Sequence, residues 1–215
     1  MKAMVIPSVM IAAIAGAACT NIERSRDLAN PAVPARVLAA QVCSNCHGID
    51  GNSESPNFPV LAAQTEPYLI EQLNSFRKHN RFDPAGFEYM WGLSKNLTDD
   101  QIKDLAKYFS GQKARPPARS SGKPAMAAAG KELFAGGVPD KNIPPCATCH
   151  GADGLGNEQF PRIANQHADY LVKQLVVFQR TDERPEGAIM KVIAHDLTRD
   201  NIESVAAYLE SLPAK

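Results

Sequence analysis

The sequence predicts an all-α protein made of two similar helical domains in tandem. Three observations predict this fold class. Residues 43–110 and 146–210 repeat one another in motif and spacing, apolar residues recur at helical intervals in both copies, and alternation of apolar and polar residues with a period of two is nowhere sustained. The 215 residues leave room for two modules of about 90–100 residues after an N-terminal processing segment.

The N-terminal segment has the layout of an export signal. Residues 1–19 begin with one lysine, continue with an apolar run of about 15 residues and end in small residues. This run is shorter than the roughly 20 residues that span a bilayer as a helix, so we predict export rather than a retained anchor. Cleavage after Ala17 and lipoprotein processing before Cys19 remain two alternatives, because Cys19 is the one cysteine outside the two pairs discussed below. Residues 20–35 would then form an N-terminal leash.

The repeat sets the remaining boundaries. We expect domain 1 at 36–110 and domain 2 at 125–215. Between them, 111–124 is rich in proline, glycine, serine and cations and contains no acidic residue, which is typical of a linker.

We predict that each copy folds as a set of helices joined by irregular loops. The Tyr-Leu-x-x-Gln-Leu-x-x-Phe stripe predicts helices at about 66–79 and 168–180. Each copy then closes with an amphipathic helix. Thr98 and Gln101 form a capping box at the start of the first closing helix, and Thr198 can cap the second.

The motif C-x-x-C-H occurs once in each copy. Its residues are Cys43, Cys46 and His47 in the first copy, and Cys146, Cys149 and His150 in the second. Two thiols three positions apart can form thioethers with the two vinyl groups of one porphyrin, and the next residue then places an imidazole at the iron. A thioredoxin-like pair and half a zinc site also use C-x-x-C, but neither requires the histidine or explains the second copy. We therefore predict two covalently bound haem c groups.

A second axial ligand is expected from elsewhere in each copy. Among the methionines beyond the signal, only Met90 and Met190 occupy matching repeat positions, 43 and 40 residues after the motif histidines. Methionine beside apolar residues can also be ordinary core filling. The rival ligands are histidines without a counterpart in the other copy: His79, His167 and His195. Two sites that arose by duplication should share their ligand type, which favours the methionines.

Pro59 and Pro161 follow the motif histidines by 12 and 11 residues. A backbone carbonyl in such a loop could accept the Nδ1 proton of the histidine and fix its orientation. A rigid turn explains the prolines equally well, and spacing alone does not decide between the two.

Together these residues resemble the dihaem cytochrome c4 family, which has monohaem relatives of the cytochrome c553 type. The resemblance rests on the C-x-x-C-H-G-x-D-G, Phe-Pro-x-Leu/Ile-Ala-x-Gln and Tyr-Leu-x-x-Gln-Leu segments and on the methionine followed by Leu-Thr. It covers about residues 36–212. It implies two tandem class I cytochrome c domains about a pseudo-twofold axis, each wrapped around a covalently attached haem with histidine and methionine ligands. It also implies that the carbonyls of Pro59 and Pro161 hold His47 and His150.

An iron with both axial positions filled by protein can change oxidation state but has no vacancy for a substrate, so we expect an electron carrier rather than an enzyme. The resemblance suggests a bacterial respiratory chain, with a quinol-oxidising complex as donor and a terminal oxidase, such as the cbb3 type, as acceptor. Two alternatives stay open: the cytochrome subunit of a periplasmic dehydrogenase complex, and a dihaem enzyme such as thiosulfate dehydrogenase. We expect the protein in the periplasm, with a membrane tether if Cys19 is lipidated.

Charge gives no sign of a nucleic-acid partner. The chain has 23 lysines and arginines against 23 acidic residues. A balanced chain has no overall field that would gather a polyanion, so partners must recognise local surface features.

Overall fold

The computed structural model describes residues 26–117, 120 and 122–214. Within these residues it contains helices and no β-strand, only two isolated antiparallel bridges, Val138 with Ile143 and Asn157 with Phe160. The all-α prediction is therefore confirmed. The expected signal at 1–19, with Cys19, and the first part of the expected leash lie outside the described residues. In the described part, no helix is long and apolar enough to cross a membrane.

The first half of the chain forms a short helical layer around the first motif. Its elements are α1 (Ala35–Leu38), a π-helical segment (Ala39–Cys43), α2 (Ser44–His47), α3 (Glu66–Arg77), a second π-helical segment (Gly86–Met90), α4 (Trp91–Ser94) and α5 (Asp99–Ser110). Helix α3 ends two residues before the predicted end, because His79 adopts a left-handed backbone conformation with φ 59°.

The second half repeats this order with a different approach to its motif. Its elements are a 3₁₀ turn (Pro124–Met126), α6 (Ala127–Gly136), a 3₁₀ turn (Pro139–Lys141), α7 (Ala147–His150), α8 (Ala168–Arg180), a 3₁₀ turn (Pro185–Gly187), α9 (Ala188–Ala194) and α10 (Arg199–Ser211). Helix α8 has the predicted bounds. Where α1 runs directly into the motif in the first half, α6 is followed by a loop closed by the Val138–Ile143 bridge.

Both closing helices begin at a complete capping box. The Thr98 hydroxyl accepts from the Gln101 backbone N–H and the Gln101 side chain accepts from the Thr98 N–H. Thr198 and Asn201 make the same exchange at the start of α10. Each box satisfies two backbone donors that the first turn of a helix leaves free, which fixes where α5 and α10 start.

Each half has its own apolar core. Helix α5 packs on α1 and α3, and α10 packs on α6 and α8. Helices α6 and α10 approach closely, and a Cβ at Gly130 would collide with the Ser204 carbonyl oxygen. Only glycine allows the two helices to meet this closely, so this position sets their spacing.

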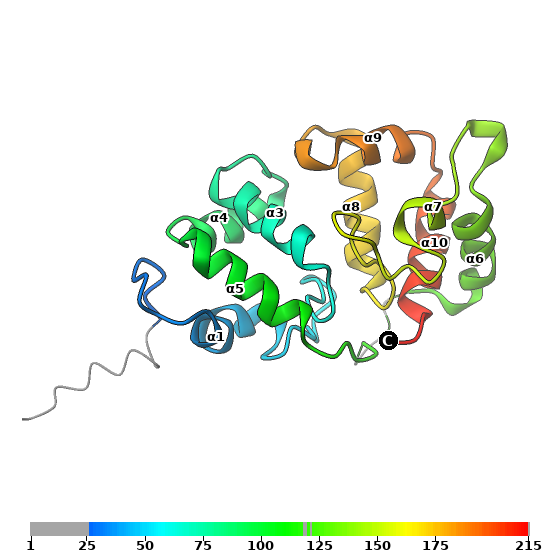
Figure 1. Cartoon of the computed structure of the whole chain (residues 1–215). Coiled ribbons are helices and arrows are strands. Elements are labelled where there is room, and N and C mark those ends of the chain that lie inside the picture. Colours follow the sequence, from blue (N-terminus) through cyan, green and yellow to red (C-terminus); the bar gives the residue numbers. More distant parts are fainter. Residues whose placement is uncertain (1–25, 118–119, 121, 215) are drawn as a thin grey trace, which may run out of the picture.

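The two halves meet where α3 and α8 face each other across the boundary (Figure 1). A buried polar network fills this contact. Arg81 donates to Gln72 of its own half and to Gln174 of the other, and Arg184 likewise donates to both glutamines. Asp83 forms a buried ion pair with Arg81. Matching residues of the two repeats therefore meet in an approximately twofold arrangement.

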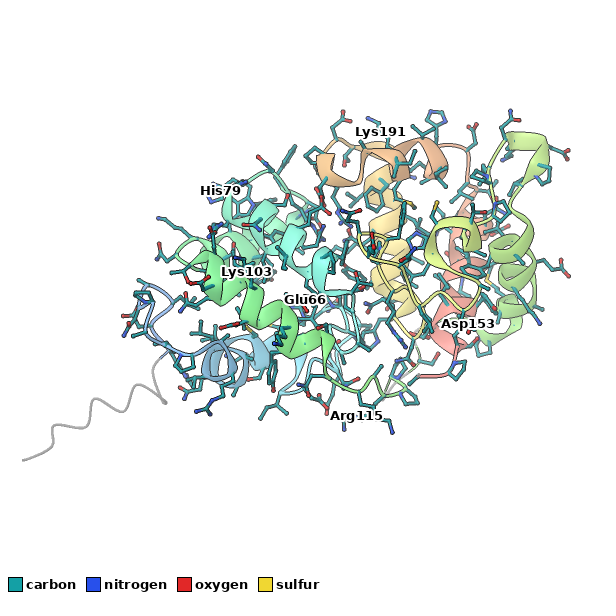
Figure 2. The ribbon with its side chains drawn as sticks, viewed as in Figure 1. Glu66, His79, Lys103, Arg115, Asp153 and Lys191 are labelled. Atoms are coloured by element: carbon teal, nitrogen blue, oxygen red, sulfur yellow. The ribbon has the colours of Figure 1, made fainter. Side chains whose placement is uncertain are left out.

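The segment predicted as a linker is held against both halves. Ala114 is buried against an apolar group that includes Val60. Arg115, at the lower edge of the molecule in Figure 2, pairs with Asp50 at 2.6 Å, and its carbonyl accepts from the Asn165 side chain of the other half. These contacts join the halves into one packed unit.

Candidate haem sites

Each motif occupies one helical turn, which brings its residues to one side of the backbone. Cys43 ends the π-helical segment, and Cys46 and His47 are the last two residues of α2. The second motif matches this, with Cys146 immediately before α7 and with Cys149 and His150 at its end. Residues three apart on a helix are neighbours, so the two thiols of each motif can reach one planar group.

Three of the four described cysteines, Cys43, Cys46 and Cys146, are half-buried, and Cys149 is exposed. None of the four forms a disulfide. Burial raises the pKa of Cys43 to about 11 and also raises the pKa of Cys146. A thioredoxin-like pair instead has a cysteine with a lowered pKa, because the thiolate is its reactive form. The raised pKa of Cys43 and Cys146 therefore does not favour a thioredoxin-like pair.

Both motif histidines are buried and held through the same ring nitrogen. His47 Nδ1 lies 3.0 Å from the Pro59 carbonyl oxygen, and His150 Nδ1 lies 2.9 Å from that of Pro161. A carbonyl oxygen can only accept, so Nδ1 carries the proton in each ring and Nε2 keeps its lone pair. Burial lowers the pKa of both histidines against the opposing effect of the carbonyl bond. Two neutral imidazoles are thus oriented as ligands for a metal.

The proline loops are fixed by the glycines that end the motifs. The Gly51 carbonyl accepts from the N–H groups of Leu61 and Ala62, and Gly154 makes the equivalent pair of bonds with Ile163 and Ala164. Gly51 has φ 78°, and a Cβ there would lie 2.8 Å from the Ala62 nitrogen. The C-x-x-C-H-G-x-D-G pattern therefore builds the turn that brings the proline carbonyl under its histidine.

The two candidate methionines occupy equivalent places in the fold. Met90 ends the π-helical segment that leads into α4, and Met190 lies in α9. Both side chains are half-buried.

The rival histidines have other surroundings. The exposed His79 stacks on Trp91 with 4.1 Å between ring centroids. His167 is fully buried between the domains, with Nε2 2.9 Å from the Ser53 hydroxyl, and His195 is exposed. These three positions share no common environment, unlike the two methionines.

Apolar side chains around these residues fit a large planar group. Most of the exposed large hydrophobic residues in the described chain lie within three positions of a motif histidine, a Phe-Pro proline or a candidate methionine: Ile49, Phe87, Tyr89, Phe160, Ile189 and Val192. These side chains are close in sequence to the predicted ligands of both halves, as expected for residues that line a haem. With the paired thiols and the oriented imidazoles, these residues fit a haem in each half.

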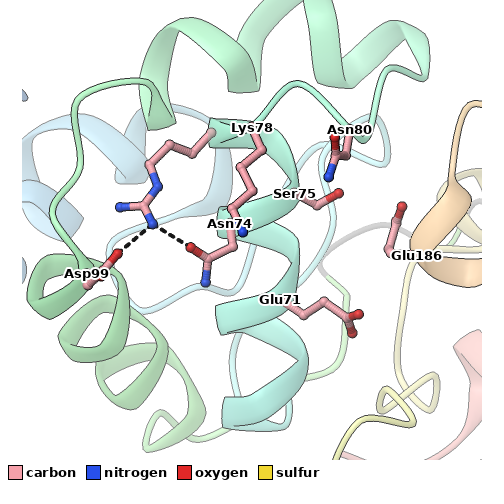
Figure 3. A pocket seen from close by; sticks show the side chains of 8 residues that line it. Glu71, Asn74, Ser75, Lys78, Asn80, Asp99 and Glu186 are labelled. Atoms are coloured by element: carbon pink, nitrogen blue, oxygen red, sulfur yellow. Dashed lines mark hydrogen bonds and ion pairs between the residues drawn. The ribbon is translucent and has the colours of Figure 1, made fainter.

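A separate surface cavity lies outside these sites. It has a volume of about 480 Å³ and opens between α3 and the turn at Pro185–Gly187 (Figure 3). It is polar, and it is lined by Glu71, Asn74, Ser75, Arg77, Lys78, Asn80, Asp99 and Glu186. Burial and the nearby negative charge of Glu186 raise the pKa of Glu71. The cavity contains no residue of either motif, so it is not part of the candidate haem sites.

The fold matches that of known cytochromes. The family model for cytochrome c matches residues 32–113 and 127–213. The chain therefore belongs to the cytochrome c family and, within it, to the dihaem cytochrome c4 group.

Three relatives illustrate this placement. Cytochrome c4 of Stutzerimonas stutzeri is 38% identical over 180 residues, which span 80% of this chain and 84% of the relative. The crystal structure of reduced recombinant cytochrome c4 from Pseudomonas stutzeri superposes with a TM-score of 0.72 at 38% identity, covering 83% of this chain and 96% of that one. A protein called thiosulfate dehydrogenase electron acceptor, from Stutzerimonas stutzeri strain A1501, is 31% identical over 82% of each chain.

The family and the two sites define the general function. The protein is a dihaem electron-transfer protein with two covalently bound haem c groups, and its partners are redox proteins. The structure brings each predicted histidine to its predicted proline carbonyl, whereas the roles of the thiols and methionines stay predictions. Sequence reasoning missed the residues that join the two sites across the domain boundary, which are described below.

Proposed function

We propose that each iron is held between a proximal histidine and a distal methionine: His47 with Met90 in domain 1, and His150 with Met190 in domain 2. The observation that carries this proposal is the duplicated contact between a buried Nδ1 and a proline carbonyl, at 3.0 and 2.9 Å. The same orientation in both halves points each Nε2 away from the proline loop, and the methionines are the matched residues available for the opposite side.

The residues of the chain would set the properties of these sites. A haem bound at each site supplies an iron that takes up and releases one electron. Cys43, Cys46, Cys146 and Cys149 would anchor it covalently, and the Pro59 and Pro161 carbonyls would keep the imidazoles in one orientation. The apolar side chains around each site would exclude water, so that little solvent has to rearrange when the iron takes up an electron. A soft thioether ligand favours the ferrous state and raises the potential relative to two imidazoles.

Two irons whose axial positions are both filled by protein ligands have no free position for a substrate, which favours an electron carrier over an enzyme. We propose that the protein receives electrons from a quinol-oxidising complex and delivers them to a terminal oxidase, such as the cbb3 type. A second donor is supported by one of the relatives, which is called a thiosulfate dehydrogenase electron acceptor. In that case the protein would accept electrons from a thiosulfate-oxidising enzyme and would not itself oxidise thiosulfate.

The proposed location is the periplasm, where the export signal would direct the chain. A diacylated Cys19 would hold the protein on the membrane, since a lipid chain contributes about 0.8 kcal/mol per buried methylene. Residues 20–35 would then act as the leash. Fractionation of the wild type and Cys19→Ser tests the anchor: a soluble wild type that begins at Ala18 would contradict it.

The function is tested by reoxidation. The reduced protein is mixed with membranes containing a terminal oxidase, with the oxidase inhibited in a parallel sample. We expect rapid, inhibitor-sensitive reoxidation and no thiosulfate consumption by the protein alone. Turnover of thiosulfate without a partner enzyme would instead establish the enzymatic alternative.

A further inference from the structure

Two buried glutamines bridge the domain boundary in a reciprocal way. Gln64 Oε1 accepts from the Arg162 N–H at 2.7 Å, and Gln64 Nε2 donates to the Arg162 carbonyl at 2.9 Å. Gln166 makes the same two bonds with Val60, at 2.8 and 3.0 Å. Gln64 and Gln166 occupy matching positions in the repeat, and both are at most 6% exposed.

The glutamines bind Val60 and Arg162, and these residues come immediately after Pro59 and Pro161. The Pro161 carbonyl and the Arg162 N–H belong to one peptide group, as do the Pro59 carbonyl and the Val60 N–H. One end of each peptide group accepts from a histidine Nδ1–H, while its other end donates to a glutamine of the opposite domain. The result is a continuous hydrogen-bond chain from His150 to Gln64, and a second from His47 to Gln166.

Such a chain transmits polarisation. The peptide C–N bond has partial double-bond character, so a hydrogen bond accepted from the N–H shifts electron density toward the carbonyl oxygen. Consecutive hydrogen bonds strengthen one another in a low-dielectric interior. A stronger acceptor at the carbonyl makes the imidazole more basic, and a more basic ligand favours ferric over ferrous iron.

We propose that Gln64 and Gln166 are positioning residues for electron transfer, each acting across the domain boundary on the proximal histidine of the other domain. Gln64 acts on His150 and Gln166 acts on His47. Each haem potential is thereby set in part by a side chain of the neighbouring domain. This inference rests on the proposed role of the two histidines as iron ligands.

The test exchanges each glutamine for a residue of similar length that makes no such bonds. In the full haem-loaded protein, Gln64→Met should raise the potential of the domain 2 haem and weaken the His150 Nδ1–H bond, with a smaller effect in domain 1. Gln166→Met should give the mirror-image result. The readouts are a redox titration and the NMR shift of each histidine ring proton in the reduced protein, with signals assigned to a domain by their neighbours.

Two further variants separate this relay from general loosening of the interface. Gln174→Met removes another buried glutamine that bonds across the boundary, to Arg81, but does not touch a proline loop. Gln174→Met should not shift the potential of the haem in the opposite domain more than that of the haem in its own domain. Gln64→Glu retains an acceptor for the Arg162 N–H and should leave the domain 2 potential unchanged or lower it.

The outcomes are distinct. Equal shifts in both haems, a larger shift in the domain that carries the substitution, or the same result for Gln64→Met and Gln64→Glu would each overturn the relay. Absence of haem-shifted ring-proton signals for His47 and His150 in the unsubstituted protein would refute the ligand assignment itself. Signals that are present but do not respond to Gln64→Met would refute only the relay.

Discussion

At the scale of single residues, His47 and His150, the proposed proximal ligands, show how little of the sequence is needed to orient an imidazole. Each ring is neutral, buried and held by one carbonyl oxygen. The sequence supplied the motif and the proline, but spacing alone left the role of the proline open. The structure brings carbonyl and imidazole together because the motif glycine binds the residues just beyond the proline.

The proposed distal ligands, Met90 and Met190, give a prediction at this scale. Met90→Ala should open one iron to external ligands such as imidazole, because alanine cannot reach the metal. Optical titration with imidazole should then show one ligand-binding haem per chain. Met126→Ala serves as the matched control, since Met126 is also half-buried but has no counterpart in the other repeat. An unchanged spectrum in Met90→Ala would show that another group is the ligand.

At the scale of elements, the sequence predicted helices well where a local signal fixed them. The closing helices begin at Thr98 and Thr198 because each capping box is encoded within four residues. The short helical segments around Met90 were not predicted. Segments of four or five residues carry too few apolar positions to show a period, and π-helical turns depend on tertiary packing.

Helix packing yields a second prediction. Gly130→Ala should destabilise domain 2 by about 1–3 kcal/mol, because the added methyl group would collide with the Ser204 carbonyl on α10. Gly136→Ala, in the same helix, meets no atom within 4 Å and should be neutral or stabilising. Denaturant unfolding of both variants measures the difference. Equal stability of the two would contradict the close contact of α6 with α10.

At the scale of the whole molecule, the domain interface is a property that the sequence did not reveal. Nothing in the repeat indicates that Gln64 reaches Arg162, because the contact depends on how two separate domains are oriented. The buried network around Arg81 and Arg184 was missed for the same reason. One signal was present: Gln64 and Gln166 recur at matching positions of the two repeats, and buried polar side chains generally have a hydrogen-bond partner.

The interface gives a third prediction. Burial alone would raise the pKa of Asp83, but attraction and hydrogen bonds from Arg81 hold it below its usual value. Asp83→Asn leaves Arg81 buried without its counter-charge and should cost about 3–5 kcal/mol. Asp99→Asn, which removes a surface partner of Arg77, should have little effect.

The same ion pair predicts a dependence on pH. A carboxyl group with a lowered folded pKa stabilises the protein fully above its unfolded value of about 4. This contribution falls as the pH drops from there toward the folded pKa. Unfolding of the wild type and Asp83→Asn should therefore differ most near neutral pH and converge in acid. A difference that persists unchanged below pH 3 would argue against the role of the Arg81–Asp83 pair.

The central claim is that both irons are closed by protein ligands and serve only to carry electrons. Carbon monoxide binding to the fully reduced protein tests this most directly, because carbon monoxide binds ferrous haem only where an axial position is free or easily vacated. We predict no change in the spectrum of either haem in the wild type and binding at one haem in Met90→Ala. Prompt carbon monoxide binding at one or both haems of the unsubstituted protein would contradict the account and indicate a site built for catalysis.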